Sequence, residues 1–356
     1  MSGKDKLRKF RENQGFACLV QPQNSELVGN SYQQDFYLKN YKYKGCWSRD
    51  FFGNGNPIVL EIGCGKGEYT LELARRCPSV NFIGIDIKGA RLWRGAKTAT
   101  EEGIANAAFI RTRIEFIEAL FAPGEVQDIW ITFADPQIGR ERHRLTSPRF
   151  LERFRNILHG DGSIKLKTDS KYLYHYTLEL LKLNSLPVNV LCEDVYAQPP
   201  VVFRSAKEDC FHQPVHSAEN ASEHSAAGGC CIMDTAGPEV AECGKLDDIV
   251  TSVQTFYEKH YIKNGLKIHY LEFSLWPVTE SVDRETFSVE NIVPAAAGAN
   301  VEIFANKFVP DTVDELSALE RRPGFVAIES PRWDESYWEA IEMQGRAGVL
   351  NNKGCL

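Results

Sequence analysis

Short apolar runs alternate with amphipathic stretches between residues 57 and 196. The apolar runs are residues 58–62, 81–85, 107–110, 128–133, 163–166 and 187–191. Helical periodicity covers residues 68–76, 88–102, 115–121, 148–158 and 171–183. Buried apolar strands that alternate with helices are typical of βαβ units in a parallel sheet covered on both faces. The pattern therefore predicts an α/β domain that begins at residue 57.

The pattern breaks after residue 196. Residues 197–246 are rich in Ala, Ser, Gly, Pro and Glu, a composition that predicts a disordered insertion. Order resumes with a predicted helix at 247–261 and a strand at 266–275, which should close the sheet and end the domain at residue 275.

Two segments flank this domain. Residues 1–56 form an N-terminal arm, with five Lys/Arg against one Asp in the first eleven positions. Residues 277–356 form an acidic C-terminal extension of unknown role, with elements expected only at 301–304, 325–328 and 335–343.

Composition is that of an ordinary globular protein: 356 residues, 43% hydrophobic and 25% charged. The net charge of -7 by itself argues against a nucleic-acid partner. However, residues 277–356 carry -7 and residues 197–246 carry -4, so the rest of the chain carries +4. A basic domain with two acidic appendages is compatible with RNA.

The expected cellular location follows from the absence of membrane-spanning and signal segments in the sequence. No apolar run is long enough for a transmembrane helix, and the charged N-terminus MSGKDKLRKF does not look like a signal peptide. Ten irregularly spaced cysteines then indicate reduced thiols in the cytoplasm. The Cys and His residues of the insertion lack zinc-finger spacing, so we expect no metal site.

A glycine loop gives the strongest local signal. The strand that ends in Glu61 is followed by Gly63 and Gly65, and the next strand ends in Asp86, which can accept both hydroxyls of a ribose. Dinucleotide sites require G-x-G-x-x-G, whereas this chain has Glu68 at the last position, where a carboxylate would repel pyrophosphate. The pattern favours S-adenosylmethionine, although the glycines could simply form a tight strand-to-helix turn.

A second polar segment follows the strand at 128–133. Asp135 lies at the end of that strand, at the edge of the sheet where the glycine loop is also expected. Six arginines against two glutamates follow between residues 140 and 155. Arg140, Arg142 and Arg144 are expected to contact phosphates, although a charge run is more often a solvated helix face.

These segments together resemble the bacterial tRNA (guanine-N7-)-methyltransferases of the TrmB type, in the branch found in Bacteroidetes. The resemblance covers about residues 1–196 and 247–275, and its segments are KDKLRKF, LEIGCGKGEYTLELA, FIGIDIKGARLWRGA, ITFADPQ, RHRLTSPRFL, IKLKTDS and TFYE. It implies a class I S-adenosylmethionine-dependent methyltransferase fold, Rossmann-like, with a mostly parallel seven-stranded sheet. It also implies methyl transfer to guanosine N7 at position 46, in the variable loop of tRNA.

The resemblance also implies roles for particular residues. Glu61, Gly63, Gly65, Asp86 and Asp135 would bind the cofactor, and Asp135 would also be catalytic. Arg113 stands where the family usually has Asp or Asn against the adenine, and it would also bind the cofactor, by its backbone if not by its side chain. Arg140 is the nearest substitute for a missing family lysine. The substrate would be bound by Arg140, Asp169, Thr255, Phe256, Tyr257 and Glu258.

Two rival functions stay open at this point. One is another S-adenosylmethionine-dependent RNA or base methyltransferase, since Asp-Pro-Gln at 135–137 is similar to the motif of amino-methylating enzymes. The other is a non-catalytic tRNA-binding subunit that keeps the fold. In each case we expect tRNA as the partner, no membrane, no required protein partner, and a monomer or homodimer in the cytoplasm.

Overall fold

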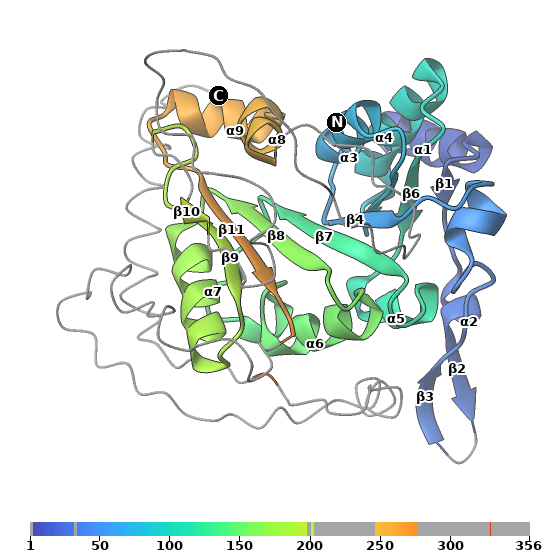
Figure 1. Ribbon diagram of the computed structural model, residues 1–356. Coiled ribbons are helices and arrows are strands. Elements are labelled where there is room, and N and C mark those ends of the chain that lie inside the picture. Colours follow the sequence, from blue (N-terminus) through green and yellow to red (C-terminus); the bar gives the residue numbers. More distant parts are fainter. Residues whose placement is uncertain (1–2, 32–33, 198–200, 203–245, 277–327, 329–356) are drawn as a thin grey trace, which may run out of the picture.

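One mixed sheet forms the centre of the protein (Figure 1). The computed structural model describes residues 3–31, 34–197, 201–202, 246–276 and 328. Within these residues the strand order is β1-β6-β5-β4-β7-β8-β11-β9-β10. The strands are β1 Leu19–Val20, β4 Ile58–Ile62, β5 Asn81–Asp86, β6 Ala107–Arg111, β7 Val126–Thr132, β8 Ser163–Thr168, β9 Val188–Cys192, β10 Val201–Val202 and β11 His269–Ser274.

The seven central strands are those that the sequence predicts. Neighbours from β6 through β8 pair in parallel, and β11 inserts antiparallel between β8 and β9. The sheet has nine strands rather than seven, because the two-residue strands β1 and β10 extend its edges. The first of these comes from the predicted N-terminal arm, and the second from the predicted insertion.

Between residues 57 and 275 the helices match the predicted pattern with one exception, whereas α1 and α2 of the N-terminal arm are not predicted by the sequence. The helices are α1 Gly3–Glu12, α2 Asn24–Leu27, α3 Glu68–Arg76, α4 Gly89–Glu102, α5 Ile117–Leu120, α6 Pro148–Ile157, α7 Lys171–Leu183, α8 Leu246–Ser252 and α9 Phe256–Lys263. The single helix expected at 247–261 is wrong, because the chain forms α8 and α9. Thr255 has an extended backbone and starts a new helix with its own capping box, which ends helical continuity.

Side-chain alternation along the strands separates two cores. Along β4, Ile58, Leu60 and Ile62 belong to the core that α5, α6 and α7 cover. Val59 belongs to the opposite core, which α3, α4 and α8 cover. Because both faces are covered, the strand reads as a continuous apolar run in the sequence.

The segment before residue 57 is partly built into the domain. Trp93 of α4 donates from Nε1 to Glu12 Oε2 of α1 at 2.6 Å, and Trp47 donates to the Leu120 carbonyl at 2.8 Å. The β2–β3 hairpin, Val28–Ser31 and Gln34–Leu38, projects away from the sheet (Figure 1). A domain boundary at residue 56 stays a prediction.

Most of the predicted appendages lie outside the described residues. This holds for residues 198–200 and 203–245 of the insertion, with its Cys and His residues, and for the elements expected at 301–304 and 335–343. Ile328 is described: it is buried, and its N–H donates to Glu152 Oε1 of α6 at 3.2 Å.

Two expectations about chemistry and location can be compared with the described residues. Cys18, Cys46, Cys64 and Cys192 are free thiols, whereas Cys77 is disulfide-bonded, so the expectation of reduced cysteines does not hold for Cys77. None of the described helices has the length and apolar character needed to cross a membrane.

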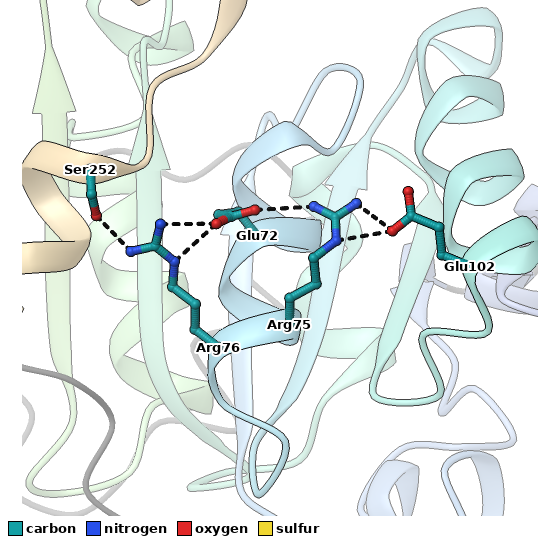
Figure 2. Close-up of polar contacts among 5 residues, drawn as sticks. All are labelled: Glu72, Arg75, Arg76, Glu102 and Ser252. Atoms are coloured by element: carbon teal, nitrogen blue, oxygen red, sulfur yellow. Dashed lines mark hydrogen bonds and ion pairs between the residues drawn. The ribbon is translucent and has the colours of Figure 1, made fainter.

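An exposed ion pair connects α3 to α4, and an exposed hydrogen bond connects α3 to α8 (Figure 2). Arg75 donates to Glu102 Oε2 of α4 from Nε at 3.0 Å and from Nη2 at 2.6 Å. Arg76 donates to Ser252 Oγ of α8 at 2.5 Å, and Glu72 accepts from both arginines. Exposed pairs of this kind contribute about 0–1 kcal/mol each, so they align the helices more than they stabilise the fold.

A buried ion pair between α5 and α6 should contribute far more. Glu118 Oε2 accepts from Arg153 Nη1 at 2.6 Å, and both side chains are 2% exposed. We expect Glu118→Ala to lower the free energy of unfolding by about 3–5 kcal/mol, because it removes the carboxylate with which the buried guanidinium pairs. Urea denaturation followed by circular dichroism measures this. The control is Glu102→Ala, which removes an exposed pair, and equal losses in the two variants would contradict the prediction.

Candidate functional site

The glycine loop after β4 leaves its backbone open to a ligand. Gly63 and Gly65 have φ of 75° and 59°, in the left-handed region that favours glycine. A Cβ placed on Gly65 would meet only the Gly63 carbonyl oxygen, at 4.0 Å. The nearly buried carboxylate of Asp86, at the end of β5, accepts from Gly65 N at 3.0 Å and from Lys88 N at 2.7 Å. Asp86 therefore holds the loop in place beside the end of β5.

Glu61 lies beneath this loop and is 4% exposed. Its Oε2 accepts from the backbone N–H of Thr70 at 2.8 Å and from the Thr70 hydroxyl, and its Oε1 accepts from Thr132 Oγ1 at 2.6 Å. Burial raises the pKa of Glu61 to about 7, even though these hydrogen bonds favour the charged form. Glu61 thus joins β4 to α3 and β7 and brings a carboxylate to the site.

Asp135 lies in a strained turn at the carboxyl end of β7. Phe133 and Gln137 have φ of 50° and 48°, which is rare for residues other than glycine. Asp135 is exposed, and its Oδ1 accepts from Gln137 N at 3.0 Å. The pairing of Thr132 with Lys167 makes β7 and β8 neighbours, so the turn lies beside the segment that carries the partly buried Asp169. Backbone strain of this kind is concentrated at functional sites.

The arginines that follow Asp135 have different environments. Arg140 is exposed, so its predicted phosphate contact stays a prediction. Arg144 is 0% exposed, and the prediction that it contacts phosphates is wrong. Its guanidinium points inward, toward the Asp135 turn and α7. A charge run in a sequence does not show which of its members face solvent.

The predicted substrate segment 255–258 begins α9. Thr255 and Glu258 cap each other reciprocally. The Glu258 carboxylate is 0% exposed, pairs with Lys167 Nζ at 2.5 Å and accepts from Tyr196 Oη at 2.7 Å. In this arrangement Glu258 is part of the core. Sequence reasoning missed Lys167, although the alternation Ile-Lys-Leu-Lys at 164–167 indicates that one face of β8 is polar.

Phe256 and Tyr257 project from the start of α9. They are 62% and 50% exposed, and their ring centroids lie 5.7 Å apart. The N–H of Phe256 donates to Glu68 Oε2 at 3.2 Å, and Lys66 Nζ lies 5.0 Å from the Phe256 ring centroid. Phe256 therefore lies beside Lys66 of the glycine loop, and Tyr257 lies next to Phe256.

Arg113 follows β6 at the same edge of the sheet. Its guanidinium is 57% exposed and pairs with Glu115 at 3.1 Å. A side-chain contact of Arg113 with a cofactor stays a prediction. Among the described residues, no three His, Cys, Asp or Glu side chains are grouped so that they could hold a metal ion.

The arrangement defines a class of protein. A parallel sheet closed by an antiparallel strand, with a glycine loop after the central β4 and an acidic residue at the end of β5, is the class I methyltransferase fold. A family model described as "Putative methyltransferase" matches residues 55–222.

The family to which the chain belongs is identified by its similarity to two relatives. The tRNA (guanine-N(7)-)-methyltransferase of Christiangramia forsetii is 44% identical over 277 residues, which is 77% of this chain and 100% of that protein. The protein of the same name from Bacteroides thetaiotaomicron is 37% identical, over 77% of this chain and 86% of that protein. The chain belongs to the tRNA (guanine-N(7)-)-methyltransferase family.

One solved structure illustrates a more distant likeness. The 16S rRNA methyltransferase KamB aligns with a TM-score of 0.39 and 12% identity, over 62% of this chain and 89% of that chain. A likeness at this level does not bear on the substrate.

The raised pKa of Glu61 predicts how stability depends on pH. The folded protein binds this proton more tightly than the unfolded chain does, since the pKa rises from 4.5 to about 7. The contribution of Glu61 to the free energy of unfolding is therefore fully present below pH 4.5. As the pH rises through about 7, the protein loses this contribution, which is about 3 kcal/mol. We expect Glu61→Gln to remove this loss. Urea unfolding of both proteins between pH 5 and 8 measures the difference, and parallel pH profiles would contradict the prediction.

Proposed function

We propose that this chain transfers a methyl group from S-adenosyl-L-methionine to N7 of guanosine in tRNA. Family membership supports the reaction. The observation that carries it is the exposed Asp135 carboxylate, which a strained turn holds at the same sheet edge as the glycine loop. An exposed carboxylate at that position can contact both a cofactor and a base.

The residues around the loop fit this cofactor. The loop backbone is open at Gly65, and Glu61 and Asp86 bring two carboxylates, while the lysine of the loop, Lys66, lies against the Phe256 ring. Such a site suits a ligand that carries positive charge and a ribose. Asp86 would accept hydrogen bonds from the ribose hydroxyls, and Glu61 would attract the positively charged end of the ligand. When bound, S-adenosylmethionine supplies an electrophilic methyl group on a sulfonium.

Guanine N7 needs positioning more than proton transfer. It carries no proton and has an in-plane lone pair, so no general base is required. The ring becomes cationic as the methyl group is added, and nearby carboxylates stabilise that charge. The same carboxylates can accept hydrogen bonds from the N–H groups at guanine N1 and N2. We assign this role to Asp135 and Asp169. Glu258 could join them only by leaving Lys167, so we assign it to positioning α9.

The aromatic pair supports an RNA base as the substrate. A base must leave its stack before its N7 can approach a cofactor held in a protein site. Phe256 and Tyr257 are exposed and can stack on such a base, a contact worth about 1–3 kcal/mol. Thr255 holds their helix by its cap, beside the loop.

A basic surface beside the site can bind the phosphates of tRNA. Exposed cations of α1, and of α4 with its first flanking residue, include Lys6, Arg11, Lys88, Arg91 and Arg94, whereas Arg8 pairs with Asp5 and Glu12. Together with the exposed Arg140, these cations would bind tRNA phosphates. We further propose position 46 as the target and the cytoplasm as the location, with the chain acting as a monomer or homodimer without a protein partner.

Asp135→Ala tests the reaction. We expect a loss in kcat of about 10²–10³-fold, because the carboxylate that favours the cationic base is gone. Mass spectrometry of nucleosides from incubated tRNA measures N7-methylguanosine. Asp161→Ala, an exposed aspartate at the other end of β8, is the control and should stay active.

Three outcomes would contradict the proposal. An active Asp135→Ala enzyme would remove the catalytic role of that residue. N6-methyladenosine as the product of the native chain would indicate the other class of S-adenosylmethionine-dependent methyltransferase. A native chain that binds tRNA but no cofactor would be a non-catalytic subunit.

Arg140→Gln tests the phosphate contact. Each lysine or arginine that neutralises a phosphate releases counterions, so its loss should weaken tRNA binding and reduce the slope of log affinity against log salt by about 1. Filter binding at KCl concentrations between about 50 and 300 mM measures the slope. The control is Arg75→Gln on α3, whose guanidinium is occupied by Glu72 and Glu102. An unchanged slope in Arg140→Gln would refute the contact.

A further inference from the structure

The side chain of Arg144 contacts the back of the turn that carries Asp135. Its Nε donates to the Pro136 carbonyl at 2.8 Å, and its Nη2 donates to the Gln137 carbonyl at 3.3 Å. Both carbonyls belong to the two residues that directly follow Asp135. The guanidinium is thus bound to the backbone of the turn, on the protein side.

Arg144 is in turn fixed by α7. Its Nη2 donates to Tyr172 Oη at 2.5 Å, and its guanidinium carbon lies 4.8 Å and 4.0 Å from the ring centroids of Tyr172 and Tyr176. The Tyr176 hydroxyl donates to Glu141 Oε1 at 2.5 Å, which holds the segment between the turn and Arg144. A guanidinium confined by two rings and three oxygens has one orientation available to it.

The turn needs such support because it is strained. Gln137 has φ of 48°, and backbone of that kind persists only when surrounding contacts hold it. Gln137 N donates to Asp135 Oδ1 at 3.0 Å, so the conformation of Gln137 also determines where the carboxylate points. The described bonds therefore form a chain from α7 through Arg144 to Asp135.

We infer that Arg144 is a positioning residue that holds Asp135 in its working orientation through the carbonyls of Pro136 and Gln137. It touches neither substrate nor cofactor. The catalytic consequence rests on the proposed function of Asp135, whereas the physical link between Arg144 and the turn does not.

The link is tested by hydrogen–deuterium exchange without any assay of activity. In Arg144→Met the amides of Gln137 and Arg140, both hydrogen-bonded within the turn, should exchange at least about tenfold faster, while the central strands keep their protection. The matched control is Arg153→Met, which removes another buried guanidinium from α6, at 2% exposure. Unchanged exchange in the turn of Arg144→Met would overturn the inference.

The catalytic consequence is tested by steady-state kinetics with tRNA, at a temperature where each variant is folded. We expect Arg144→Met to lose about 100-fold in kcat with an unchanged salt slope of tRNA binding, because a small misplacement of a reacting group costs that much. Arg144→Lys keeps the charge and should recover part of the rate. Arg153→Met should keep the native kcat. A reduced salt slope with native kcat would make Arg144 a phosphate contact and overturn the inference.

A double-variant cycle separates positioning from general destabilisation. If Arg144 acts through Asp135, then adding Arg144→Met to Asp135→Ala should lower the residual rate by less than about threefold. Full additivity would overturn the inference. Should Arg144→Met fail to fold, Tyr172→Phe removes only one of its partners and should shift exchange and kcat in the same directions. A native chain with no N7-methylguanosine product would refute the proposed function and leave the exchange result to decide the link.

Discussion

The buried ion pair between Lys167 and Glu258 determines where the C-terminal part of the domain meets the sheet. Both side chains are 0% exposed, and Lys167 Nζ also donates to the Val250 and Val253 carbonyls at the end of α8. Burial lowers the pKa of Lys167, and the Glu258 carboxylate opposes that shift. The ammonium group of Lys167 thereby pairs with a carboxylate and donates to carbonyl groups at the end of α8. These contacts give α8 and α9 a defined position over β8 (Figure 1). The exposed aromatics at the start of α9 reach the glycine loop as a result.

Buried charge recurs around the site, and each time it links two pieces of chain. Glu61 joins β4 to α3 and β7, Asp86 joins β5 to the glycine loop, and Arg144 joins α7 to the Asp135 turn. Burying a charge costs free energy unless it is paired and hydrogen-bonded, so such groups define one geometry rather than add much stability. The loops at the carboxyl ends of the strands are held from below, while their outer surfaces stay available to ligands.

The exposed side of this edge has a different character. Phe256 and Tyr257 offer aromatic faces, and Asp135 and Arg140 are exposed around the turn. Cations along α1 and α4 extend the positive surface away from the carboxylates. A polyanion that presents one splayed base would meet phosphate contacts first and stacking contacts at the centre. The net charge of the whole chain conceals this division, because the net negative charge comes from the two appended segments, which carry -7 and -4.

By itself, the sequence determined the sheet, most helices and the place of the site. Buried strands leave apolar runs, helices leave periodic patterns, and the ends of parallel strands share one edge, so Glu61, Asp86 and Asp135 could be placed together without coordinates. Only the tertiary structure decided which charged residues are buried. Arg140 and Arg144 are alike in sequence, yet one is exposed and the other is enclosed by Tyr172 and Tyr176. Glu258 reads as a substrate ligand until Lys167, 91 positions earlier, is seen to pair with it. Burial and partners of this kind depend on contacts between distant segments, and local residue patterns do not encode them.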